Sequence, residues 1–211
     1  MSQSDSRISS HVQVGMRILF ITHPEVVVDP SVPVPEWPLS ERGRERMNLF
    51  ADALAGVSAL AVWSSAERKA LDGAQILADR LSIPHHVDPA LGENDRSSTG
   101  YIPQPEFDRI AAEFFASPTT SIRGWETAAA AQKRIVGAIE TVLARGAGLK
   151  LVVSHGGVGR LLRARLENVP IGSETRPGHS GGGCCMMLRG LPLEPLSPWT
   201  DIEDWPTAAS S

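Results

Sequence analysis

Two histidines of the sequence follow short apolar runs, and they are the residues best suited to chemistry. His23 comes two positions after residues 17–21, and His155 comes two positions after residues 149–153. An imidazole titrates near neutral pH, so a positioned histidine can act as a nucleophile, a base or an acid. One histidine at the end of a strand is either a turn residue or a catalytic residue. Two histidines at two such ends favour catalysis.

Positive side chains follow the apolar runs as well. Residues 59–63 lead into a polar junction that carries Arg68 and Lys69, and Arg96 lies in a later polar loop. Such donors bind anionic oxygens, an arginine through a rigid fork of N–H groups and a lysine as a point charge. Histidines and cations together indicate a site for an anion.

A carboxyl group is needed if the chemistry includes proton transfer to a leaving oxygen. The candidates are Glu93, Asp95 and Glu25. The sequence has no His-Glu-x-x-His spacing of a metal site, so we expect no metal and no cofactor. Residues 181–183 are three glycines that open no helix, which argues against a phosphate-binding P-loop.

Alternating strand and helix patterns must position these side chains. Apolar runs predict strands at residues 16–21, 59–63, 83–87, 149–153 and 184–188. Helical spacing predicts a helix capped by Ser40, one capped by Ser64 or Ser65, and helices over residues 105–115, 125–144 and 158–166. This alternation predicts a three-layer α/β fold, with a mostly parallel sheet and helices on both faces. Ligands of such folds bind at the carboxyl ends of the strands.

Length and composition favour one domain. The 211 residues are 42% hydrophobic and carry a net charge of −4, which argues against a nucleic-acid surface. No apolar run is long enough for a membrane span, and residues 1–14 resemble no secretory signal. We expect a tail at residues 1–14, a domain at 15–191 and a tail at 192–211. Adjacent Cys184 and Cys185 suit reduced thiols of a cytoplasmic protein.

Four short segments, in order, give the chain a recognisable pattern. They are Pro-Leu-Ser-Glu-Arg-Gly at residues 38–43, Ser-Ala-Glu-Arg-Lys-Ala-Leu-Asp-Gly-Ala at 65–74, Leu-Gly-Glu at 91–93 and Ser-His-Gly at 154–156. Together with the strand that ends at His23, this order resembles the histidine phosphatase superfamily and its phosphoglycerate mutase-like fold.

The resemblance implies hydrolysis of a phosphomonoester on a phosphorylated small molecule through a phosphohistidine. It makes His23 the nucleophile and Glu93 the general acid and later base. It makes His155 a ligand of the transferred phosphoryl group. Transfer of the phosphoglycerate mutase type is less favoured.

Three positions depart from the pattern of that family. Thr22 replaces an arginine, Pro24 replaces a glycine and Lys69 replaces a second arginine, with Arg68 beside it. Thr22, Lys69, Arg68 and Arg96 are therefore the predicted phosphate-binding residues. The same departures support an alternative, which is a weak or inactive relative that binds a phosphorylated or anionic ligand or a partner protein.

Overall fold

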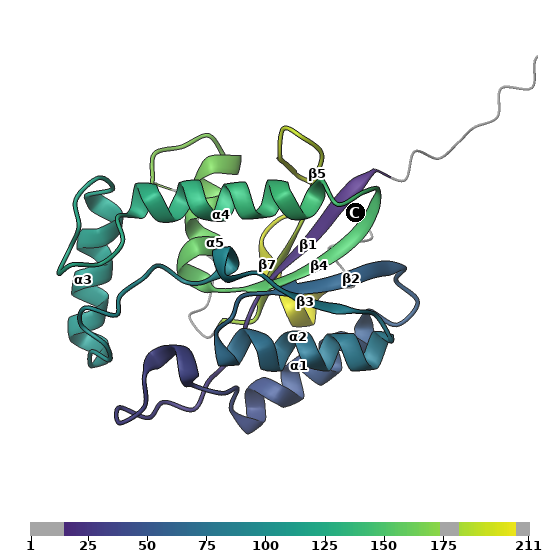
Figure 1. Ribbon diagram of the computed structural model, residues 1–211, viewed down its shortest axis with the longest axis horizontal. Helices are drawn as coiled ribbons and strands as arrows, with labels where there is room; N and C mark the ends of the chain where they lie inside the picture. Colours follow the sequence, from purple (N-terminus) through teal and green to yellow (C-terminus); the bar gives the residue numbers. More distant parts are fainter. Residues whose placement is uncertain (1–14, 174–181, 206–211) are drawn as a thin grey trace, which may run out of the picture.

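The computed structural model describes residues 15–173 and 182–205, and Figure 1 shows a central sheet with helices against both faces. The sheet has the strand order β3-β2-β4-β1-β5-β6, and β7 pairs with β5. Strands β1 to β4 run parallel and β5 runs antiparallel to β1, which confirms the predicted mostly parallel α/β fold.

The strands lie close to the predicted positions. Their bounds are β1 (Met16–Thr22), β2 (Ala59–Ser64), β3 (His85–Val87), β4 (Gly148–Ser154), β5 (Cys184–Arg189), β6 (Glu194–Pro195) and β7 (Thr200–Asp201). The helices are α1 (Glu41–Ala53), α2 (Arg68–Leu81), α3 (Gln104–Ala116), α4 (Ala128–Leu143) and α5 (Gly156–Leu166). Short 3-10 helices are η1 (Val34–Glu36), η2 (Pro89–Leu91) and η3 (Ile202–Asp204).

Two apolar cores lie on the two faces of the sheet. Successive side chains of a strand point to opposite faces, so Ile18 and Phe20 pack with α3, α4 and α5, whereas Leu19 and Ile21 pack with α1 and α2. All four side chains are fully buried. The covered faces explain why β1 and β4 read as continuous apolar runs in the sequence.

The helix starts differ in part from the predictions. Ser40 caps α1, and its hydroxyl accepts a hydrogen bond from the Gly43 N–H, as expected. Neither Ser64 nor Ser65 caps α2, because the cap position is Glu67. Helix α4 begins three residues later than predicted, at Ala128 after Thr127.

Residues 192–205 are not a tail, because they add strands to the sheet and side chains to the core. Strands β6 and β7 pair with β5, and Ile202 and Trp205 are buried against the core beside α1. The expected domain end at residue 191 is therefore too early. The expected tail residues 1–14 and 206–211 lie outside the described residues. Cys184 and Cys185 are both free and buried.

No helix of the described segments has the length and apolar character that crossing a membrane requires.

Gly43 allows α1 to touch the loop that follows β1. The Ser40 N–H donates to the carbonyl oxygen of Glu25, and a Cβ atom placed on Gly43 would lie 2.2 Å from that same oxygen. Any larger residue would push α1 away from the loop that carries His23. This close approach gives the glycine of the Pro-Leu-Ser-Glu-Arg-Gly segment a physical reason.

We predict that Gly43→Ala lowers the free energy of unfolding by about 1–3 kcal/mol, because the new methyl group overlaps main-chain atoms. Gly137→Ala is the matched control, since it also lies in a helix and its Cβ would meet nothing within 4 Å. The control should be neutral or stabilise by up to about 1 kcal/mol. Urea denaturation measures both, and equal effects at the two positions would contradict the packing argument.

Candidate active site

The two histidines meet at the carboxyl edge of the sheet. Strands β1 and β4 end side by side, with Thr22 paired to Ser154, and each strand delivers its histidine at the next position. The ring centroids of His23 and His155 lie 5.2 Å apart in an edge-to-face arrangement. The two imidazoles are therefore close enough to act on one phosphoryl-sized group.

His23 is held in one tautomer by the main chain. Its Nδ1 lies 2.8 Å from the carbonyl oxygen of Pro24, which can only accept a hydrogen bond, so Nδ1 carries the proton. Burial lowers the pKa of His23 to about 4 against the smaller opposing effect of that hydrogen bond. The ring is neutral at pH 7, and its Nε2 keeps a free electron pair. Pro24 lacks an N–H group but contributes this carbonyl.

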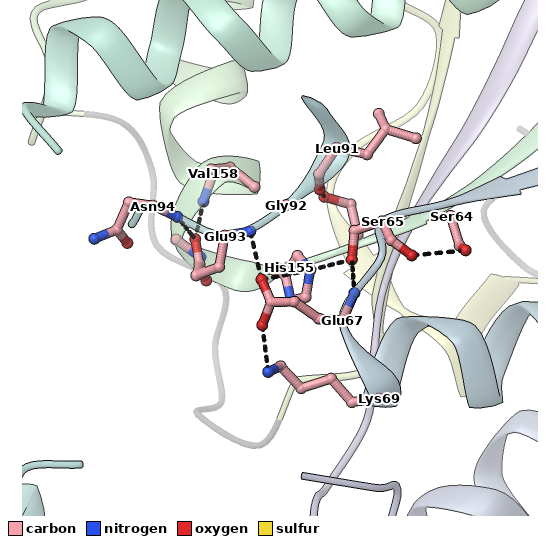
Figure 2. A network of polar contacts seen from close by, with 12 residues as sticks. Ser64, Ser65, Glu67, Lys69, Leu91, Gly92, Glu93, Asn94, His155 and Val158 are labelled. Carbon is pink, nitrogen blue, oxygen red and sulfur yellow. Dashed lines mark hydrogen bonds and ion pairs between the residues drawn. The ribbon is translucent and has the colours of Figure 1, made fainter. Parts of the chain in front are cut away.

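His155 is fully buried, and its Nε2 faces two oxygen atoms. Ser65 Oγ lies at 2.7 Å and Glu67 Oε1 at 3.3 Å, as Figure 2 shows. Burial shifts the pKa of His155 well below its ordinary value. Within the described residues, its Nδ1 has no hydrogen-bond partner. A buried ring nitrogen without a partner leaves capacity for a ligand.

Glu67 is a site residue that the sequence analysis missed. Its Oε2 accepts a hydrogen bond from Lys69 Nζ at 2.5 Å, and its Oε1 accepts one from the Glu93 N–H at 2.8 Å (Figure 2). Burial works to raise the pKa of Glu67, but His155, Lys69 and the Glu93 N–H outweigh it and hold that pKa at about 2. A negative charge therefore stands beside both His155 and Lys69.

Lys69 is at the predicted place but is not a free cation. The side chain is 5% exposed, and its ammonium group is shared between Glu67 and the carbonyl oxygen of Val34 at 3.0 Å. Its charge is balanced by Glu67, so an incoming anion has to compete with a carboxylate that is already bound.

Glu93 lies in the same network, but its carboxylate caps α5. One oxygen accepts from the Gly157 N–H at 2.9 Å, and the other accepts from the N–H groups of Val158 at 2.9 Å and Asn94 at 3.1 Å. The positive end of a helix dipole stabilises a negative charge at this position. Gly157 makes room for it, since a Cβ there would lie 2.6 Å from Glu93 Oε1.

The alternative carboxylates lie elsewhere. Glu25 pairs with Arg42 and Arg46, which tie the loop after β1 to α1. Asp95 accepts a hydrogen bond from the Ser97 N–H in an exposed turn.

Two predicted phosphate ligands are engaged outside the site. The hydroxyl of Thr22 accepts a hydrogen bond from the Cys184 N–H at 2.9 Å, and the side chain is buried beside β5. Arg68 is half exposed and pairs with Asp72 at 2.8 Å along α2. The structure therefore does not bring Thr22 or Arg68 to the histidines.

Arg96 is the remaining candidate cation. Its guanidinium lies 4.7 Å from the centroid of the Phe107 ring, and among the described residues no carboxylate forms an ion pair with it. The positive charge of Arg96 adds a small effect to burial in lowering the pKa values of both His23 and His155, and Arg96 lines one cavity with Glu67 and Glu93. An arginine without a carboxylate partner can grip phosphoryl oxygens.

Arg134 is a second residue that the sequence analysis did not identify. It pairs with Glu126 at 2.7 Å and donates to the carbonyl oxygens of Ala90, Gly92 and Glu93. These bonds fix the loop that carries Glu93 against α4. Glu126 precedes this helix instead of lying inside it, so sequence spacing gave no signal for the pair.

A cavity of about 400 Å³ borders the network at Glu67 and Glu93 and extends past Arg96. Among the described residues, no group of three histidine, cysteine or acidic side chains is arranged to hold a metal ion.

Comparisons with known proteins place these features in a family. A family model for the histidine phosphatase superfamily (branch 1) matches residues 32–189. The match begins after His23, at a position in the proline-rich loop. A search of the curated proteins gives no match.

Solved structures share the fold, and two of the three below are named phosphatases. The native mycobacterial glucosyl-3-phosphoglycerate phosphatase is 22% identical, with a TM-score of 0.69 over 89% of this chain and 93% of that one. Bacillus stearothermophilus YhfR is 24% identical, with a TM-score of 0.71 over 82% and 90%. The Shigella flexneri alpha-ribazole phosphatase is 22% identical, with a TM-score of 0.57 over 82% and 89%.

We predict that His23 stays a neutral ring with its proton on Nδ1 throughout the range above about pH 5, because its pKa is lowered to about 4. Nitrogen NMR of the ring, assigned with His23→Gln, measures the tautomer and the midpoint. A midpoint near 6.5 would contradict the burial.

The lowered pKa of His23 also makes the stability of the folded protein depend on pH. The unfolded chain binds a proton at His23 near pH 6.5, whereas the folded chain resists it down to about pH 4. The free energy of unfolding should therefore fall as the pH drops through this window, and less so in His23→Gln.

Proposed function

The chain belongs to the histidine phosphatase superfamily, and from this premise we propose that it hydrolyses a phosphomonoester through a phosphohistidine on His23. The observation that carries the proposal is the hydrogen bond from His23 Nδ1 to Pro24, which leaves Nε2 as an unprotonated nucleophile. His155 stands beside it, and in the tautomer whose Nε2 accepts from Ser65 Oγ its Nδ1 carries a proton that a phosphoryl oxygen can accept. The phosphatase names of the structural neighbours agree with this chemistry.

In the first step, His23 Nε2 attacks phosphorus and the bond from phosphorus to the alcohol oxygen breaks. Glu93, protonated at the start of this step, gives that oxygen a proton, so a neutral alcohol leaves and Glu93 becomes the carboxylate that the N–H groups of Asn94, Gly157 and Val158 stabilise. In the second step, Glu93 takes a proton from water, whose oxygen attacks the phosphohistidine. The products are inorganic phosphate and free His23. Splitting the reaction in this way is ordinary covalent catalysis.

Arg96 takes the place of the missing phosphate clamp in this proposal. Thr22 offers no charge and its hydroxyl is bound to Cys184, while Lys69 is balanced by Glu67. Arg96 can donate to the phosphoryl oxygens as charge shifts in the transition state. The substrate is a phosphorylated small molecule. The two free, buried thiols suit work in the reducing cytoplasm.

The Glu67–Lys69 pair favours a second candidate function. The ionised Glu67 carboxylate is already paired with Lys69 and lies 3.3 Å from His155 Nε2. A doubly charged phosphoryl group would therefore be attracted by Lys69 and repelled by Glu67. A relative with this site could bind an anionic ligand or partner and turn it over slowly or not at all. Turnover decides between the two candidates.

We predict that incubation of the protein with 4-nitrophenyl phosphate, followed by an acid-free quench, traps phosphate on His23. His23→Ala should reduce turnover to the uncatalysed rate, because no second nucleophile replaces its Nε2. His86→Ala is the matched control, since His86 is exposed and stacks on Trp63 at the far edge of the sheet. Steady turnover in His23→Ala, or phosphate found on another residue, would refute the mechanism.

We predict that Glu67→Gln tightens vanadate binding by about 10- to 100-fold. The amide keeps the shape of the side chain but releases the Lys69 ammonium, and a hydrogen bond to a charged group contributes about 1.5–3 kcal/mol. Arg96→Ala should weaken vanadate binding by a similar factor.

Arg68→Ala controls for the removal of an arginine, because Arg68 pairs with Asp72 outside the site. Glu106→Gln controls for the removal of an exposed carboxylate. Isothermal calorimetry measures all four variants. Weaker vanadate binding in Glu67→Gln, or an equal loss in Arg68→Ala and Arg96→Ala, would contradict this description of the clamp.

A further inference from the structure

The cavity beside the histidine site is mostly apolar. It has a volume of about 400 Å³ and borders the site at Glu67 and Glu93. Much of the remaining wall is made by three prolines and two small apolar residues, which are Pro33, Val34, Pro35, Ala66 and Pro89. An alcohol that leaves from a phosphoryl group at His23 would enter this space, because the cavity adjoins the proposed acid Glu93.

A second hollow continues the first. It measures about 320 Å³ and shares Val34, Arg96 and Gly100 with the first cavity. Its wall includes three aromatic residues, Trp37, Tyr101 and Phe107. The ring centroids of Trp37 and Tyr101 lie 5.7 Å apart, and the Arg96 guanidinium lies over the Phe107 ring. The space beyond the reacting group therefore becomes more aromatic with distance from the histidines.

One polar group in the first cavity has no use within the protein. Asn94 is 9% exposed, and its Nδ2 has no hydrogen-bond partner among the described residues. Figure 2 shows its side-chain amide pointing away from Glu93 and His155. A buried amide donor without a partner costs free energy, so a ligand acceptor that this amide can reach by a turn of the Asn94 side chain at the cavity wall is favoured.

We propose that the substrate is a phosphomonoester of an apolar, ring-containing alcohol that carries one hydrogen-bond acceptor for Asn94. This inference rests on the proposed function and names its substrate class. Asp95 and Ser97 also line the cavity, but sugar hydroxyl groups that face its prolines and valine would lose water without gaining partners, so a sugar phosphate fits poorly. Apolar ring surface gains free energy from the same walls.

The first experiment measures binding apart from turnover. His23→Ala cannot form the phosphohistidine, so calorimetry can compare 4-methylumbelliferyl phosphate with glucose 6-phosphate, which carry the same phosphoryl group. We expect the aryl phosphate to bind at least about 10-fold more tightly, a difference of about 1.4 kcal/mol. Equal affinity, or a preference for the sugar phosphate, would overturn the proposal.

The second experiment tests the wall of the cavity. Ala66→Leu narrows it at an exposed position and should weaken binding of the aryl phosphate by about 10-fold. Ala130→Leu makes the same change on α4 outside the cavity and should have no effect. Unchanged binding in Ala66→Leu would show that the aryl group lies elsewhere and would refute the assignment.

The third experiment tests the role of Asn94. 1-Naphthyl phosphate has a fused ring without the lactone carbonyl of the umbelliferyl group. Asn94→Ala should therefore weaken binding of 4-methylumbelliferyl phosphate by about 5- to 10-fold more than that of 1-naphthyl phosphate. Asn48→Ala, on an exposed face of α1, is the control. An equal loss for both ligands would overturn the acceptor part of the proposal.

The two proposals fail in different ways. If His23→Ala discriminates between the alcohols but the wild-type protein neither turns over 4-nitrophenyl phosphate nor carries phosphate on His23, phosphohydrolase activity is refuted and the cavity assignment stands. If His23 is phosphorylated but the alcohols bind equally, the substrate class is refuted and the mechanism stands.

Discussion

The carboxylate of Glu67 is largely but not fully buried among three groups that depend on its charge. Lys69, the Glu93 N–H and His155 all face it, and they come from α2, the loop after η2 and the end of β4. A buried ion is costly unless it is paired, and removal of one partner leaves the other charge uncompensated. Glu67 therefore holds α2, the loop after η2 and the end of β4 together at the edge of the sheet that carries the histidines. The same carboxylate neutralises Lys69, which was expected to bind phosphate.

Much of this fold could be predicted because it follows from local patterns. Apolar runs that are covered on both faces located β1 and β4, and strand ends in a parallel sheet converge, so His23 and His155 were expected together. Ser40 was recognisable as a cap from residue type and position. The C-terminal segment was not, because β6 and β7 are two-residue strands whose pairing with β5 leaves almost no pattern.

The parts of the site that escaped prediction rest on long-range contacts. Thr22 looked available next to His23, but its hydroxyl bonds to the Cys184 main chain, 162 positions away. Glu67 fell within the helix predicted to be capped by Ser64 or Ser65 and was given no role, and only the tertiary fold pairs it with Lys69 away from most of the solvent. Sequence gives the type of an ionisable side chain and its neighbours along the chain. It does not show which side chain becomes its ion-pair partner in the folded protein, and that partner decides whether the charge is available to a ligand.

In the proposed function, these charges shift the source of specificity from the phosphoryl group to the alcohol. Glu67 balances the charge of Lys69, and among the described residues Arg96 is the candidate phosphate ligand without a carboxylate partner, so we expect the phosphoryl group alone to contribute little binding free energy. Arg96 also lines both hollows, and Phe107 stands in the wall of the second. Binding of a remote apolar group can hold a phosphoryl group near His23 Nε2 even where the clamp is weak. A site of this kind would select its substrate by the alcohol, which is the leaving group of the reaction.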